Sequence, residues 1–398
     1  MFLSILALLA CCGVWIATPA QAASAMIQLS PGSGPAGTKV TVTGTAFPKK
    51  TSGTVSAGST SVAFKTSASG YFTADVVMPE AVDPVIAVRA VSGSVSASAS
   101  FALTSSSPSG TPDPSPLQFG VGTAGGPLAG AEIDEVTALA GEAPSIILSY
   151  KDFNQAPPIA ELEAVRGRGA KTLLTWEPWS WGGGAEQPRY SLDRIVAGDF
   201  DPYLREWGQS LAAWGHPVLL RFGHEMNGNW YPWSEQVNGN GAGDYAAAWR
   251  HVHDVVQSTG ATNIAWVWNP NVPYWGSAPL AGLYPGSTYV DVVALDGYNW
   301  GTSASWSTWQ SPTQLFGDGL SQLRTLAPGK QILIAETASA EQGGSKAEWN
   351  TSLISYLSAQ TDVAAVIWFH FNKETDWRIN SSVSSAQALA AALAGRPK

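Results

Sequence analysis

The run PVLLRF, residues 217–222, is almost continuously apolar and lacks the alternation of a strand with one face in water. Continuous runs of this kind are typical of parallel strands that are covered on both faces. Seven further runs of the same character lie elsewhere between residues 117 and 369. They are LQFGVG (117–122), SIILSY (145–150), KTLLTW (171–176), NIAWVW (263–268), YVDVVAL (289–295), QILIAE (331–336) and AAVIWF (364–369).

Segments with helical spacing separate these runs. In one of them, Tyr245, Trp249, Val252 and Val256 share one helical face. Eight strands that alternate with helices predict a (β/α)8 barrel, with a doubly wound open sheet as the alternative. The crossover near 277–287 has only a short, weak helical pattern. The other helical patterns span residues 131–141, 158–168, 201–214, 243–258, 313–326, 346–359 and 384–394.

The chain before the barrel has a different composition. Residues 25–104 are rich in Ser, Thr, Ala, Val and Gly, contain no Trp, and carry short alternating runs between turn residues. This pattern predicts a small antiparallel β-sandwich. Residues 27–47 resemble the opening of an IPT/TIG immunoglobulin-like domain. Residues 105–116 (SSSPSGTPDPSP) are expected to be a linker, and residues 117–398 the barrel domain.

The N-terminal segment has the pattern of an export signal. An apolar run at 3–17 precedes an Ala-x-Ala site that ends at Ala22, so residues 1–22 are expected to be removed from a secreted protein. The run is too short for a comfortable membrane span. Lipidation at Cys11 is the alternative. Because Cys11 and Cys12 are the two cysteines of the chain, neither a disulfide framework nor a thiolate zinc site is expected.

The composition excludes several classes of protein. The 398 residues include 21 Lys and Arg against 30 Asp and Glu, a net charge of -9, which disfavours a nucleic-acid-binding protein. A hydrophobic fraction of 45% excludes wholesale disorder. We expect a monomer without metal or cofactor.

Carboxylates follow several of the predicted strands. Glu177, Glu225, Asp296 and Glu336 lie at strand ends beside tryptophans, and chemistry in a barrel belongs at the carboxyl ends of its strands. Aromatic rings suit the apolar faces of sugars, and cleavage of a glycosidic bond needs two carboxyl groups. The pattern therefore predicts a glycoside hydrolase acting on a polysaccharide.

The residues around these carboxylates resemble a known family. The segment RFGHEMNGNWYPW (221–233) resembles the signature of glycoside hydrolase family 26, the clan A β-mannanases and their relatives, and the resemblance covers roughly residues 117–398. Further matching segments are LTWEPW (174–179), WRHVH (249–253), YPGSTYVDVVALDGYNW (284–300), ILIAETAS (332–339) and DWR (376–378).

The resemblance implies roles for individual residues. Glu225 would be the general acid/base and Glu336 the nucleophile of a retaining enzyme, in which the two carboxyl groups lie about 5–5.5 Å apart. Arg221 and His224 would tune the proton of Glu225. Tyr298 would donate a hydrogen bond to Glu336 and keep it ionised.

Other residues are candidates for contacts with the sugar. Trp230 and Trp368 would stack beside the cleaved bond. Glu177 and Asp296 are expected to hold loops or orient their neighbours, and His370 is open between packing and substrate contact. Weaker candidates for substrate contacts are Trp176, Asn227, Trp233 and Trp377.

The expected function is that of a secreted retaining endo-β-glycanase acting on β-1,4-mannan. A β-1,3:1,4-glucanase, a β-1,3-xylanase and an exopolysaccharide hydrolase of the same family remain open. A non-catalytic polysaccharide-binding surface protein is the alternative from another class, and the presence of both glutamates and Tyr298 argues against it.

Overall fold

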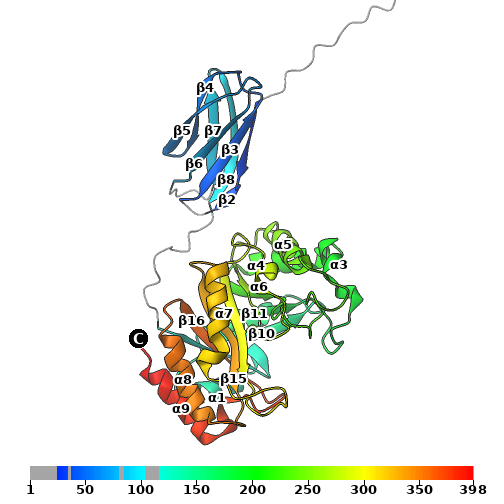
Figure 1. The fold of residues 1–398 in the computed structure, drawn as a ribbon, viewed down its shortest axis with the longest axis vertical. Helices are drawn as coiled ribbons and strands as arrows, with labels where there is room; N and C mark the ends of the chain where they lie inside the picture. The colour runs from blue at the N-terminus through cyan, green and yellow to red at the C-terminus, as the bar shows by residue number, and fades with distance from the viewer. Residues whose placement is uncertain (1–24, 35–36, 80–84, 104–115, 398) are drawn as a thin grey trace, which may run out of the picture. The chain divides into compact units, whose positions relative to one another are not determined.

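The computed structural model describes residues 25–34, 37–79, 85–103 and 116–397 (Figure 1). The chain divides into two compact units, Met1–Ser109 and Gly110–Lys398. The predicted signal segment and almost all of the predicted linker lie outside the described residues.

The N-terminal unit is built from β-strands alone in its described part, which confirms the all-β prediction for this region. The strands form a sheet of order β1-β3-β6 and a sheet of order β2-β8-β7-β4-β5. Side chains of β3 alternate between buried and more exposed positions, because one face of the strand covers a shared core. The strands are β1 (Met26–Ser30), β2 (Ser33–Gly34), β3 (Lys39–Thr45), β4 (Ser52–Ala57), β5 (Thr60–Lys65), β6 (Phe72–Val77), β7 (Val85–Ser92) and β8 (Val95–Leu103).

The second unit is a closed barrel of eight parallel strands, in the order β10-β11-β12-β13-β14-β15-β16-β9. The predicted barrel is therefore confirmed, and the open sheet is wrong. All eight apolar runs of the sequence fall on these strands. They are β9 (Gln118–Thr123), β10 (Ile146–Asp152), β11 (Lys171–Glu177), β12 (Val218–Phe222), β13 (Ile264–Trp268), β14 (Val292–Asn299), β15 (Gln331–Ser339) and β16 (Val363–His370).

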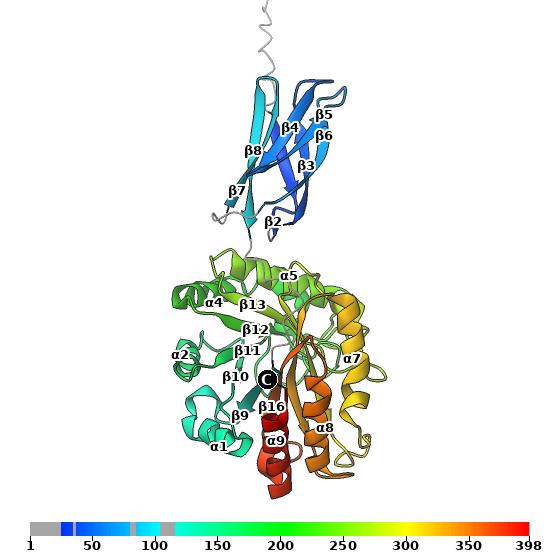
Figure 2. The same ribbon diagram turned by 90° about the vertical axis from the view of Figure 1, so that its left-hand side faces the viewer.

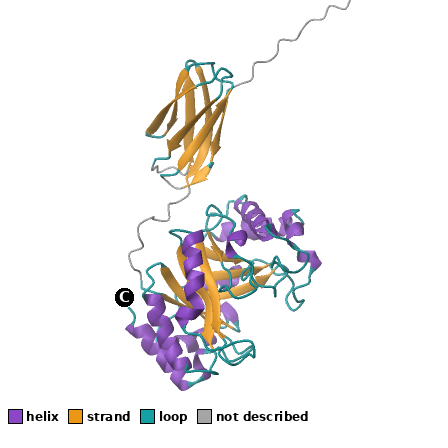
Figure 3. Cartoon of the chain, viewed as in Figure 1, coloured by secondary structure: helices purple, strands orange, loops and turns teal. Residues whose placement is uncertain are grey.

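Helices surround the barrel strands (Figures 2 and 3). Each predicted helical segment contains a helix, and the weak crossover contains a helix of four residues, α6. A Ser311–Gln314 capping box and Pro312 begin α7. No helix among the described residues is long and apolar enough to cross a membrane. The helices are α1 (Gly130–Ala140), α2 (Ile159–Gly167), α3 (Leu192–Val196), α4 (Asp201–Trp214), α5 (Asp244–Gln257), α6 (Leu280–Leu283), α7 (Pro312–Leu326), α8 (Lys346–Ser358) and α9 (Val383–Gly395), with 3-10 turns η1 (Gly126–Leu128), η2 (Pro188–Tyr190) and η3 (Ile379–Ser381).

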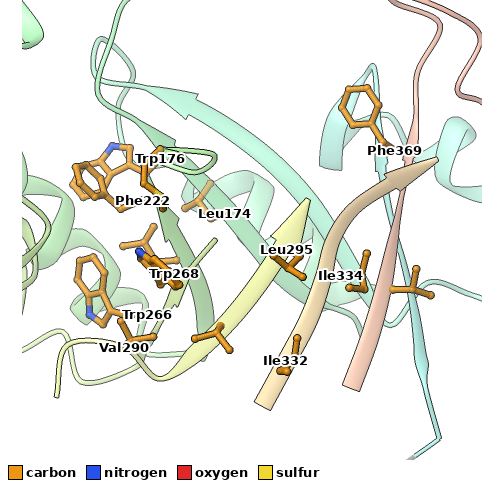
Figure 4. Packing of buried hydrophobic residues seen from close by; sticks show 14 of the residues in the cluster. Leu174, Trp176, Phe222, Trp266, Trp268, Val290, Leu295, Ile332, Ile334 and Phe369 are labelled. Carbon is orange, nitrogen blue, oxygen red and sulfur yellow. The ribbon is translucent and has the colours of Figure 1, made fainter. Parts of the chain in front are cut away.

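Both faces of the barrel strands are apolar, and they belong to two different clusters. Leu148, Leu173 and Leu333 lie in the cluster that fills the barrel interior. Their neighbours Leu174 and Ile334 lie in the larger cluster shared with the helices (Figure 4). Because successive side chains of a strand point to opposite faces, only every second residue is directed toward the barrel axis and the mouth of the barrel.

Strand β15 departs from this alternation. Leu295 of β14 pairs with Ile334 of β15, and the next residue of β14, Asp296, pairs with Glu336. Over this step β14 advances by one residue while β15 advances by two. Its register with β16 shifts in the same region, between Ile334 and Thr337. One extra residue in β15 is a β-bulge, which re-aims the side chains that follow it. Glu336 is the first ionisable residue after this irregularity.

Candidate active site

A large cleft lies at the carboxyl ends of the barrel strands and has a volume of about 1420 Å³. Residues at the end of every one of the eight strands, or in the loop that follows it, contribute to its wall. This volume exceeds the roughly 300–1,000 Å³ of sites for small ligands. The cleft is therefore large enough for a ligand of several rings.

The backbone after β12 presents Glu225 to the cleft. Strand β12 ends at Phe222, and both Gly223 (φ 51°) and Glu225 (φ 53°) are left-handed. This conformation costs a non-glycine residue roughly 1–2 kcal/mol. The Glu225 amide donates to the Asn269 carbonyl at 2.7 Å, and the Glu225 carbonyl accepts from the Gly228 amide at 3.0 Å. Two backbone hydrogen bonds thus hold the strained residue in place.

The Glu225 carboxyl group is buried and accepts two hydrogen bonds. Asn271 Nδ2 donates to Oε1 at 2.7 Å, and Trp230 Nε1 donates to Oε2 at 2.9 Å. Burial is the largest cause that raises the pKa of Glu225, to about 7, and the charge of Glu336 adds to it. The two hydrogen bonds act in the opposite direction. Near neutral pH this carboxyl group can therefore give up or take up a proton, as a general acid/base must.

The Glu336 carboxyl group is held by three donors. Tyr150 Oη donates to Oε1 at 2.7 Å, Tyr298 Oη donates to Oε2 at 2.5 Å, and Arg221 forms an ion pair with Oε1. Burial, together with the neighbouring charge of Glu336, raises the pKa of both tyrosines, so both stay protonated as donors. Three donors to one carboxylate fix its orientation.

Arg221 connects the carboxylates below the cleft and is fully buried. Its Nε donates to Thr175 Oγ1 at 2.8 Å, and Nη1 pairs with Asp296 at 3.0 Å. Burial lowers the pKa of Arg221, but the charges of Asp296 and Glu336 together outweigh this effect. The pKa is raised as a result, and the guanidinium remains charged. Asp296 therefore compensates the arginine, and the pair positions Glu336 from beneath.

His224 and Glu177 form a second polar group in the cleft wall. Burial, followed by the charge of Arg221, lowers the pKa of His224 well below its usual range, so the imidazole is neutral. Its Nδ1 has no hydrogen-bond partner among the described residues and lies 3.9 Å from Glu177 Oε1. The indole groups of Trp181 (2.5 Å) and Trp179 (3.3 Å) donate to Glu177 Oε2. Burial raises the pKa of Glu177 to about 7.

One group of residues has the composition of a metal site. His224, Asp296 and Glu336 each offer a ligand atom, and these atoms lie within 4.8 Å of one another. Arg221 pairs with both carboxylates, so a cation would have to displace a buried guanidinium. The arrangement fits an ion-pair network better than a metal centre, and the expected absence of a cofactor stays a prediction.

The cleft brings together most of the residues that the sequence singled out. Arg221 does not line the cleft but pairs with Glu336, which does. The predicted site residues that line it are His224, Glu225, Trp230, Tyr298, Glu336 and Trp377, together with Glu177.

Four predicted substrate contacts lie outside the cleft wall and are corrected here. Trp176 packs with Leu174 in the cluster that the strands share with the helices (Figure 4). Trp368 belongs to the same cluster. Trp368 Nε1 donates to the Trp377 carbonyl at 2.9 Å, so it supports the wall from behind. The other two are Asn227, which bonds the backbone of Asn271, and Trp233, whose Nε1 donates to the His224 carbonyl.

Two polar residues of the site escaped the sequence reasoning. Tyr150 ends an apolar run and shares the inward face of β10 with Leu148, so its position at a strand end was an available signal. Asn271 lies in the loop after β13, where no periodicity indicates which way a side chain points. His370 accepts a hydrogen bond from the Ile379 amide at 3.1 Å and does not line the cleft, which favours a role in packing.

Comparisons with known proteins agree with this geometry. Residues 191–371 match the model of glycosyl hydrolase family 26. Endoglucanase H of Acetivibrio thermocellus is 43% identical over 251 residues, 61% of this chain and 26% of that protein. Mannan endo-1,4-beta-mannosidase A and B of Caldalkalibacillus mannanilyticus is 37% identical over 90 residues, 21% of this chain and 17% of that protein. The chain thus spans about a quarter or less of the length of these relatives.

Solved structures show the same fold. The catalytic domain of a Bacillus sp. GH26 endo-beta-1,4-mannanase superposes with a TM-score of 0.54 at 20% identity, over 71% of this chain and 86% of that one. A GH26 beta-mannanase from Bacteroides ovatus also has a TM-score of 0.54, at 18% identity, over 71% of this chain and 89% of that one. Residues 191–371 of the barrel thus match the model of glycosyl hydrolase family 26, and the barrel shares the fold of these solved structures.

Proposed function

We propose that the chain is a retaining endo-β-glycanase that cleaves its substrate in two displacements. The observation that carries the proposal is the contrast between two carboxyl groups in one cleft. Glu225 has a pKa raised to about 7, whereas Glu336 is surrounded by one cation and two hydroxyl donors. Carboxyl groups in opposed environments supply the acid and the nucleophile of a glycosidase.

The steps follow from these environments. Glu225 donates its proton to the glycosidic oxygen while Glu336 attacks the anomeric carbon, so the leaving sugar departs and a glycosyl-enzyme ester forms. Glu225, now a carboxylate, takes a proton from water, and this water attacks the anomeric carbon and releases Glu336. Two inversions retain the anomeric configuration.

The aromatic lining supports a polysaccharide substrate. Within the described residues 116–397, the exposed tryptophans and tyrosines all line the cleft. Exposed aromatic groups that gather in one place mark a binding surface. They are Trp181, Trp230, Tyr274, Trp275 and Trp306.

Two polysaccharides, β-1,4-mannan and β-glucan, are candidates for the substrate. The sequence resemblance and the named mannosidase relative favour β-1,4-mannan. A β-glucan is favoured by a different observation, because the match that spans 251 residues is to a protein named an endoglucanase. We place β-glucan first on the length of that match, and mannan second.

A reducing-sugar assay on a panel of polymers tests the proposal. The panel contains mixed-linkage β-glucan, carboxymethylcellulose, β-1,4-mannan, β-1,3-xylan and microbial exopolysaccharides. We expect product from the wild type and its near-complete loss in Glu225→Ala and Glu336→Ala. Wild-type activity in Glu336→Ala would falsify the assignment of the nucleophile, and binding without product would favour a non-catalytic protein. NMR of the first product anomer tests retention.

We also propose that the chain is exported. The apolar run and the Ala-x-Ala site near Ala22 support this proposal. Mass spectrometry of the protein recovered from the medium of the producing cells should give an N-terminus at Ala23. A protein that stays in the cells with its N-terminus intact contradicts it, and a diacylglycerol modification at Cys11 would favour the lipoprotein alternative.

A further inference from the structure

Two tryptophans at the rim of the cleft are far more exposed than packing explains. Trp275, in the loop after β13, is 99% exposed, and Trp306, in the loop after β14, is 72% exposed. Trp275 buries almost no area in the fold and Trp306 buries only a minor part of its side chain, so both contribute little to its stability. Both residues nevertheless line the same cleft as the two catalytic carboxyl groups.

The first of these residues ends an aromatic row that begins at the acid/base. Trp230 donates to Glu225 and is 38% exposed. Its ring stacks on Tyr274, with centroids 5.8 Å apart and an interplanar angle of 28°, and Tyr274 is 41% exposed. Trp275 follows directly in the chain. Exposure therefore rises from Trp230 through Tyr274 to Trp275.

A second row begins at the nucleophile. The ring of Tyr298, which donates to Glu336, lies 5.0 Å from Trp377. Trp377 lies 4.9 Å from Trp300, and Trp300 lies 5.1 Å from Trp306. Trp377 is buried, Trp300 is partly buried, and Trp306 is exposed. Trp306 is thus three ring contacts away from the residue that touches the nucleophile.

Other exposed groups of the cleft have local explanations. Trp181 donates its indole proton to Glu177, and Trp230 donates to Glu225. Neither Trp275 nor Trp306 makes a side-chain hydrogen bond to another described residue, and both offer open indole faces at the cleft rim. Such faces suit the apolar C–H face of a pyranose ring in a polar ligand.

We propose that Trp275 and Trp306 are sugar-binding platforms at the outer ends of the two aromatic rows. They hold glycosyl units of a polymer that lie beyond the units on either side of the cleaved bond. The inference rests on the proposed function and deepens it, because it assigns the site to long chains. Such platforms give long substrates an advantage over short ones, since a short glycoside fills the centre of the cleft and reaches neither rim.

Binding and cleavage are measured separately. In a Glu336→Ala background, the retardation of the full chain in gels that contain mixed-linkage β-glucan or β-1,4-mannan is compared with and without Trp275→Ala and Trp306→Ala. We expect each substitution to weaken binding by about tenfold, which is what about 1.4 kcal/mol from one covered indole face supplies. Val383→Ala is the matched control, because Val383 is 74% exposed on α9 and does not line the cleft.

Cleavage gives the second measurement, with Glu336 intact. We expect kcat/KM on the polymer to fall about tenfold in Trp275→Ala and Trp306→Ala, while kcat/KM on 4-nitrophenyl β-cellobioside and β-mannobioside stays at the wild-type value. Unchanged retardation in the gels, an equal loss on polymer and short glycoside, or a change of oligomeric state on gel filtration would overturn the inference. A wild type that cleaves nothing refutes the proposed function alone, because the gel measurement does not need turnover.

Discussion

The hydrogen bond from Trp230 to Glu225 makes the pH profile of the enzyme a test of the site. Glu225 must hold its proton to act as the acid in the first step. Its pKa is about 7, because burial and the charge of Glu336 outweigh the opposing hydrogen bonds from Asn271 and Trp230. We therefore expect kcat/KM of the wild type to fall as the pH rises through about 7.

The substitution Trp230→Phe keeps an aromatic ring and removes the indole N–H that donates to Oε2 at 2.9 Å. A hydrogen bond to a charged group contributes about 1.5–3 kcal/mol, and one pKa unit corresponds to about 1.4 kcal/mol. The loss of this donor destabilises the carboxylate, so the pKa of Glu225 should rise by about one unit. Because Trp230 is partly exposed and water can replace its N–H, the lower end of the range applies.

The assay is the pH dependence of kcat/KM on the polymer that the wild type cleaves best, from pH 4 to 10. We expect the alkaline limb of Trp230→Phe to move upward by about one unit, and that of Trp306→Phe, which does not contact Glu225, to stay in place. If the pKa of the alkaline limb is unchanged or lower in Trp230→Phe, then Glu225 does not control this limb. The assignment of Glu225 as the acid/base would have to be abandoned.

Three further predictions follow from the same contacts. Arg221→Met leaves Asp296 and Glu336 buried without their cation and should cost about 3–5 kcal/mol of stability. Denaturant unfolding followed by Trp fluorescence measures this cost in the barrel. A cost below about 1 kcal/mol would contradict a stabilising role of these ion pairs. Tyr150→Phe removes a donor to Glu336 and should lower kcat/KM about 10- to 100-fold with an unchanged melting temperature; unchanged kinetics would argue against its role. Lys346 is buried, and burial lowers its pKa to about 8. The folded protein therefore releases this proton at lower pH than the unfolded chain does. As the pH rises from 8 to the ordinary lysine pKa of 10.5, the free energy of unfolding of the wild type should increase by about 3 kcal/mol relative to that of Lys346→Met. A difference that does not depend on pH contradicts this assignment.

The architecture was accessible from the sequence because it depends on local patterns. A strand that is covered on both faces needs a continuous apolar run, and runs such as 217–222 and 331–336 all became barrel strands. The position of a carboxylate directly after such a run places it at the mouth of a barrel. This reasoning placed Glu225 and Glu336 at the mouth together with Glu177 and Asp296, and the resemblance to a known family singled out the first two.

The direction of individual side chains was not accessible in the same way. In an amphipathic strand the polar positions show which face is exposed, but a barrel strand is apolar on both faces. The sequence therefore did not distinguish the inward side of β11 from its outward side. Trp176 and Trp368, which lie near the carboxyl ends of β11 and β16, pack on the helix side. Tyr150 points inward and contacts Glu336.

The sequence by itself determined the order of strands and helices and the end of the barrel at which the cleft lies, since these follow from patterns within short segments. Its resemblance to a known family then singled out Glu225 and Glu336 among the carboxylates at that end. Only the tertiary structure decided which side chains meet there. Simple alternation would direct Glu336 toward the helices, on the same face as Ile334, and one extra residue in β15 turns it into the cleft. A bulge is a relation between neighbouring strands, and Arg221, Tyr150 and Tyr298 reach Glu336 from three other strands that only the closed barrel brings together.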